Sequence, residues 1–83
     1  MKISKNVAIS ESGFLLNTAS GESYSVNPIG VEIINLIKED KSFDEISKII
    51  TEKYDVDINT LEKDYQDYCK MLEYYRLNET ENQ

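Results

Sequence analysis

The hydrophobic pattern of the chain changes its period at Asn27 and Pro28. Before this point apolar residues alternate with polar ones, which is typical of strands; after it they recur every three or four residues, which is typical of helices. Three strands are predicted, over residues 3–10, 14–18 and 23–26. Short turns at 11–13 and 19–22, each with a glycine, connect them into an antiparallel meander. Asn27 fits a helix N-cap and Pro28 the first helical position.

The third predicted strand has two different faces. Tyr24 and Val26 share one face and are expected to point to the core, whereas Ser23 and Ser25 share the other and are expected to point outward. A three-stranded meander has two outer strands, so an unpaired edge is expected. The third strand carries no lysine, proline or other residue that commonly blocks such an edge, and we expect it to accept an extended peptide.

Three helices are predicted after the strands. The first has an apolar face of Ile29, Ile33, Ile34 and Ile37, flanked by Val31 and Leu36. The second begins with a capping box between Ser42 and Glu45, and its face is Phe43, Ile46, Ile49 and Ile50. The third is capped either by Asp57 or by Asn59, which would pair with Glu62.

The third predicted helix is the longest. One continuous stripe, expected in the core, consists of Leu61, Tyr65, Tyr68 and Leu72, with Cys69 beside it. Asp64, Met71 and Tyr75 follow one flank of this stripe. For Met71 and Tyr75, a role in lining a binding groove and a plain position at its rim remain open. For Asp64, recognition of a basic residue of a partner and a solvated charge on the helix face remain open. Residues 78–83 are polar and aperiodic and are expected to form a disordered tail after a single domain over residues 1–77.

Strands followed by helices predict an α+β fold in which the helices pack on one face of the sheet. The formal charge is −7, and its excess lies in the helical part: residues 1–27 carry two lysines against two acids. A nucleic-acid-binding domain needs a basic stripe, and anionic membranes attract basic segments, so neither partner is expected. No apolar run approaches the about 20 residues that cross a bilayer, and a cytoplasmic protein is expected.

The chain offers little for catalysis. It contains no histidine, no glycine-rich phosphate loop and a single cysteine, Cys69. A Cys-His nucleophile, a zinc site and an internal disulfide are therefore not expected. Asp55, Asp57 and Asn59 lack the glycine and the final glutamate of a calcium loop, and helix capping explains them better. We expect no metal, no cofactor and no enzymatic activity.

Three segments together resemble the PqqD family, the RiPP recognition elements of ribosomally synthesised peptide pathways. They are YSVNPIGVEIINLI at 24–37, DKSFDEISKIITEKYDVD at 40–57 and LEKDYQDYCKMLEYYRL at 61–77. The resemblance implies a small winged-helix-like domain, with a three-stranded antiparallel sheet followed by three helices. It departs from the family at Arg76, where the family usually has glycine, and this leaves open a third helix that runs on past Arg76.

The resemblance also implies a function. Family members bind the leader segment of a precursor peptide, which adds as a strand beside the third strand in a groove also lined by the third helix, and they deliver it to a modifying enzyme, often a radical-SAM protein. By position, the peptide-binding residues would be Ser23, Tyr24, Ser25, Val26, Asp64, Tyr68, Met71 and Tyr75.

Two other functions remain open from the sequence. A winged-helix fold also occurs in DNA-binding regulators, because a fold alone does not fix function. A structural adaptor could form a homodimer through the exposed edge or by exchange of its N-terminal strands. The acidic charge disfavours the first of these, and the second is compatible with peptide binding if the dimer hides the groove.

Overall fold

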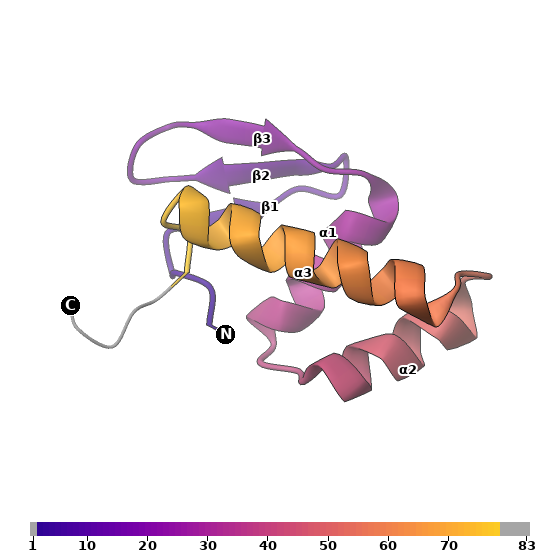
Figure 1. The fold of residues 1–83 in the computed structure, drawn as a ribbon. Coiled ribbons are helices and arrows are strands. Elements are labelled where there is room, and N and C mark those ends of the chain that lie inside the picture. Colours follow the sequence, from indigo (N-terminus) through magenta and orange to yellow (C-terminus); the bar gives the residue numbers. More distant parts are fainter. Residues whose placement is uncertain (1, 79–83) are drawn as a thin grey trace.

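The computed structural model describes residues 2–78. Its strands and helices begin and end near the turn and capping signals of the sequence. The strands are β1 (Val7–Ile9), β2 (Phe14–Asn17) and β3 (Ser23–Ser25), and the helices are α1 (Pro28–Lys38), α2 (Phe43–Lys53) and α3 (Ile58–Tyr74). The strands form one antiparallel sheet in the order β1-β2-β3. This confirms the predicted α+β fold of three strands followed by three helices (Figure 1).

The predicted first strand was too long. Lys5 and Asn6 form a turn, closed by a 3.1 Å hydrogen bond from the Val7 N–H to the Ser4 carbonyl, so β1 begins only at Val7. Ile3 instead makes an isolated antiparallel bridge with Asn78. The predicted tail therefore starts with a paired residue, and its remainder, 79–83, lies outside the described residues.

Each helix begins at a capping residue that satisfies its free N–H groups. Asn27 accepts from the Gly30 N–H at 2.7 Å, and both halves of the Ser42–Glu45 capping box are present. The backbone hydrogen bond from Ser42, followed by that of its side chain, lowers the pKa of the Glu45 carboxyl. Of the two caps left open for α3, Asp57 is the one observed, and it accepts from the N–H groups of two following residues.

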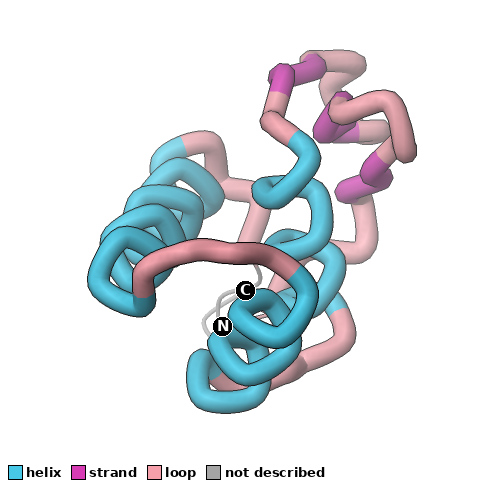
Figure 2. Tube along the Cα trace, turned by 90° about the vertical axis from the view of Figure 1, so that its right-hand side faces the viewer, coloured by secondary structure: helices cyan, strands magenta, loops and turns pink. Residues whose placement is uncertain are grey.

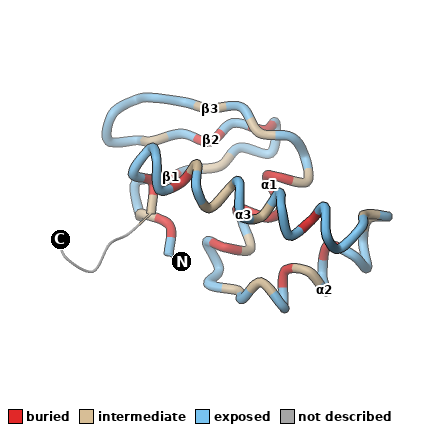
Figure 3. Tube along the Cα trace, in the orientation of Figure 1, coloured by how far each residue is buried: buried red, intermediate tan, exposed pale blue. Residues whose placement is uncertain are grey.

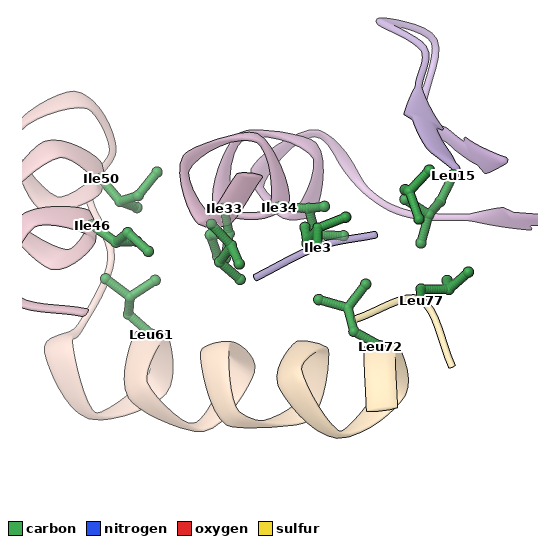
Figure 4. Packing of buried hydrophobic residues seen from close by; sticks show 11 residues of the cluster. Ile3, Leu15, Ile33, Ile34, Ile46, Ile50, Leu61, Leu72 and Leu77 are labelled. Atoms are coloured by element: carbon green, nitrogen blue, oxygen red, sulfur yellow. The ribbon is translucent and has the colours of Figure 1, made fainter. Parts of the chain in front are cut away.

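One continuous apolar core joins the helices to the sheet. Figure 4 shows the buried side chains of α1, α2 and α3 in a row that ends at Leu15 of β2 and at Leu77. In the view of Figure 2, the strands gather at one side of the molecule and the helices at the other. Figure 3 shows buried positions in the sheet and in the helices, with exposed positions between them. The prediction for Ile49 was wrong: α2 contacts the core through Ile46 and Ile50, and Ile49 is 39% exposed beside that stripe.

The third helix ends without the glycine that is common at this point. Arg76 adopts the left-handed conformation with φ 57°, and two hydrogen bonds, from Arg76 N–H to Glu73 O (3.0 Å) and from Leu77 N–H to Leu72 O (2.7 Å), close a Schellman motif. Leu72 and Leu77, which are both fully buried, complete it with an apolar contact. The alternative of a helix running past Arg76 is therefore wrong, and α3 ends at Tyr74.

Replacing Arg76 by glycine is expected to stabilise the domain by about 0.5–1 kcal/mol. A left-handed conformation costs a residue with a Cβ about 1–2 kcal/mol, and part of the gain is offset because glycine makes the unfolded chain more flexible. Urea denaturation would measure the difference. Arg76→Ala is the matched control, since it removes the same side chain but keeps the Cβ; equal stability of the two variants would contradict the explanation.

Candidate functional site

One edge of the sheet lies on β3, which within residues 2–78 pairs only with β2. Two hydrogen bonds define the pairing: the Asn17 N–H donates to Glu22 O at 2.8 Å, and the Val26 N–H donates to Gly13 O at 2.8 Å. In an antiparallel ladder, hydrogen-bonded and non-bonded pairs alternate. Tyr24 lies midway between Glu22 and Val26 in the chain, so its backbone groups also point toward β2.

Ser23 and Ser25 consequently present their backbone to the outside. They occupy the non-bonded pairs with β2, so their N–H and C=O groups point away from the sheet. Within residues 2–78, the hydrogen bonds outside the ladders include none from these four groups. Both serine side chains are exposed, as predicted, and share the outer face with Phe14 and Leu16, which are 50% and 37% exposed.

An aromatic stack connects β3 to the end of α3. The ring of Tyr24 lies on the ring of Tyr75 with centroids 4.2 Å apart and planes at 30°. Tyr74, which is 80% exposed, meets Tyr75 edge-on at 5.0 Å. Burial, and after it the charge of Glu22, raises the pKa of the Tyr24 hydroxyl.

A second contact joins α3 to the strand–helix junction. The Tyr68 hydroxyl donates to Asn27 Oδ1 at 3.1 Å, and the same oxygen accepts the capping bond from the Gly30 N–H. Burial is the main cause that raises the pKa of Tyr68, and the charge of Asp64 adds to it. Asn27 therefore connects the end of β3, the start of α1 and the middle of α3.

The predicted residues of α3 share one face but differ in their surroundings. Tyr68 and Tyr75 both contact the segment that contains β3, and Met71 between them is half-buried against the core. Asp64 is exposed, one turn before Tyr68. We call residues 23–26, which comprise β3 and Val26, together with Asp64, Tyr68 and Met71 of α3 and its C-cap Tyr75, the β3–α3 surface. Of the predicted strand residues, Tyr24 and Val26 are half-buried toward the core, as expected.

Two features of this site were not predicted from the sequence. Gly30 is buried under the Tyr68 ring, where a Cβ would lie 2.4 Å from the hydroxyl oxygen. The second role of Asn27, as acceptor for Tyr68, was not predicted either. An isolated glycine within a helical pattern often has a packing reason, and this was the one signal that pointed to Gly30.

The rest of the described chain shows no sign of a reactive thiol, a metal site or a membrane span. Burial, as the largest cause, raises the pKa of the Cys69 thiol, which disfavours the reactive thiolate. Within the described part of the chain, no group of three or more potential ligands is arranged to hold a metal ion. No helix over these residues has the length and apolar character needed to cross a membrane.

The comparisons with known proteins agree with this architecture. The family model of PqqD, the coenzyme PQQ synthesis protein D, matches residues 13–77. The solved structure of TbiB1 in complex with the TbiA(beta) leader peptide is similar, with a TM-score of 0.79, 30% identity and full coverage of both chains. A lasso peptide synthetase B1 complexed with the leader peptide has the same fold, with a TM-score of 0.73, 18% identity and coverage of 88% and 89%. No curated protein sequence matches the chain.

The βββααα order and these matches define a domain of the RiPP recognition element class. The chain belongs to the PqqD family. The resemblance seen in the sequence is thereby confirmed.

Proposed function

We propose that the domain binds the leader segment of a ribosomally made precursor peptide by strand addition to β3 and presents it to a modifying enzyme. The observation that carries this proposal is the open edge of β3, where the N–H and C=O groups of Ser23 and Ser25 point outward beside α3. The leader peptides in both matched complexes support the same ligand class. The domain itself performs no chemistry in this proposal.

The pairing pattern of β3 determines which groups of such a peptide would contact the domain. Backbone bonds to Ser23 and Ser25 give affinity, and side chains give specificity. Residues directly opposite in a ladder share a face. The peptide residue opposite Tyr24 therefore points toward α3, where Tyr68, Met71 and Tyr75 contact it. Its neighbours, opposite the two serines, point to the outer face.

The proposed site includes Val26 and Asp64. Val26, directly after β3, packs against the core on the same side as Tyr24. Asp64 is exposed on the same helix face as Tyr68, and its carboxylate suits a basic side chain of the leader. The acidic charge of the helical part favours the same basic or neutral peptide.

The wider setting follows from the proposed ligand. Residues 1–77 act as one peptide-binding domain. The second partner is the modifying enzyme, a radical-SAM protein or an enzyme of another class, and the proposed compartment is the cytoplasm, where precursor peptides are made. The DNA-binding regulator gains no support from the family model or the two structural matches. A homodimer through β3 would use the same edge and would compete with the leader.

Amide hydrogen exchange read by NMR, with and without the cognate leader, tests this proposal. We expect the Ser23 and Ser25 amides to become protected, because they gain partners, and the Tyr24 amide to change little, because it already bonds to β2. Chemical shifts of Tyr68, Met71 and Tyr75 should move as well. An equal gain in protection at all three strand amides would contradict the assigned register, and shifts confined to residues 42–54 would exclude the β3–α3 surface.

A further inference from the structure

The sheet has a second edge, on β1, and it is built differently from the edge on β3. The Thr18 N–H donates to Asn6 O at 2.7 Å, and the Ser10 N–H donates to Phe14 O at 2.9 Å. These two bonds identify two hydrogen-bonded pairs between β1 and β2. Along the ladder between them, hydrogen-bonded and non-bonded pairs alternate. The remaining strand residues at odd positions therefore direct their N–H and C=O groups away from β2. They are Val7 and Ile9.

Both outward groups of Val7 already have partners within the chain. Its N–H donates to the Ser4 carbonyl at 3.1 Å, and its C=O accepts from the Lys38 ammonium at 2.9 Å. Lys38 is the last residue of α1 and lies 31 positions later in the sequence. The ammonium thus occupies the place from which an incoming strand would donate its own N–H.

The two edges differ in how many of their outward backbone groups have partners. Each short outer strand directs two residues outward, and so offers four backbone groups. On β3 all four, from Ser23 and Ser25, have no partner among the hydrogen bonds described above; on β1 two of the four are engaged. A strand that added to β1 would have to displace the Lys38 ammonium and desolvate it. Lysine on an edge is a known means of preventing strand pairing.

We propose that Lys38 closes the β1 edge, so that the domain accepts a single extended segment, at β3, and does not pair with a second copy through β1. The part of this inference that concerns the leader rests on the proposed function. The part that concerns self-pairing does not, because it follows from the sheet alone. Lys38 is thus a specificity-determining residue that acts by excluding the wrong edge.

The test compares wild type with Lys38→Met, Lys38→Arg and Lys48→Met. Methionine keeps the unbranched stem and helix preference of lysine but cannot donate to Val7 O, and arginine keeps a cationic donor. Lys48 is an exposed lysine of α2 and serves as the control for the loss of one charge. Far-UV circular dichroism verifies that each variant is folded.

Sedimentation velocity without peptide is the first measurement. We expect Lys38→Met to self-associate at least about tenfold more tightly than the other three proteins, with new amide protection at Ile9. If Lys38→Met sediments like Lys48→Met and its Ile9 amide stays unprotected, the inference is overturned. Association with protection at Ser23 and Ser25 instead would place the contact on β3 and would also overturn it.

Calorimetric titration with the cognate leader is the second measurement. Wild type and Lys38→Arg are expected to bind one peptide, whereas Lys38→Met gains a second, weaker site on β1. Failure of wild type to bind any leader would contradict the proposed function but not the self-pairing result. A single site on Lys38→Met, with normal affinity at β3, would contradict the role of Lys38 and leave the proposed function standing.

Discussion

Replacing Ser25 by proline is expected to weaken leader binding by about 100-fold while the domain stays folded. Proline removes the backbone N–H, and at Ser25 this donor points outward and serves no bond within the sheet. Proline is tolerated on edge strands when its N–H side faces solvent. The residue before a proline must be extended, and Tyr24 already lies in a strand. The variant thus removes one hydrogen-bond donor from the open edge of β3 and leaves the sheet intact.

The loss of affinity has two sources. A carbonyl of the leader loses its donor and is left unsatisfied at the interface, which costs about 1–3 kcal/mol. The pyrrolidine ring also projects from the edge and keeps the next strand at a distance. Isothermal titration calorimetry with the cognate leader measures the affinity, and thermal unfolding of the free variant shows whether the fold is kept.

Ser25→Ala is the matched control for this prediction. It removes the hydroxyl but keeps the N–H, and the exposed serine side chain lies on the outer face rather than along the edge. We expect its affinity to stay within about threefold of wild type. If alanine weakened binding as much as proline, the side chain rather than the backbone would make the contact. If neither variant weakened binding, the leader would bind elsewhere.

The sequence predicted those parts of the fold that local signals determine. The cap at Asn27, the capping box at Ser42 and the two faces of β3 depend on residues a few positions apart, and all were confirmed. The end of α3 was harder, because a residue with a Cβ occupies a left-handed position at Arg76. That conformation is held by two hydrogen bonds and by the contact of Leu72 with Leu77 in the core, and the glycine that usually marks such a helix end in a sequence is missing.

The long-range contacts near the two edges of the sheet could not be predicted from the hydrophobic pattern of the sequence. Lys38 meets Val7 across 31 residues, and Tyr68 meets Asn27 across 41. Periodicity indicates which face of an element is buried, but not which residue of another element it meets. The helix face that carries Tyr68 and Tyr75 could therefore be predicted, whereas the partner of each ring could not.

Replacing Gly30 by alanine is expected to destabilise the domain by about 2 kcal/mol. In an ordinary helix this change would stabilise by about 1 kcal/mol. Here the new Cβ would lie 2.4 Å from the Tyr68 hydroxyl oxygen and 2.7 Å from Cζ of its ring. The ring would have to move, which costs about 1–3 kcal/mol in a packed site, and its hydrogen bond to Asn27 would be lost, which costs about 1 kcal/mol more.

A double-mutant cycle with Tyr68→Ala separates these terms. Without the ring, the nearest atom to the new Cβ is Asn27 Oδ1 at 3.1 Å, a close contact that a small shift relieves. Gly30→Ala should then stabilise the Tyr68→Ala background by about 0.5 kcal/mol, so that the effect changes sign. Urea denaturation of the four proteins measures the coupling. If Gly30→Ala had the same effect in both backgrounds, the ring of Tyr68 would not rest on Gly30, and the link between α3 and the strand–helix junction would have to lie elsewhere.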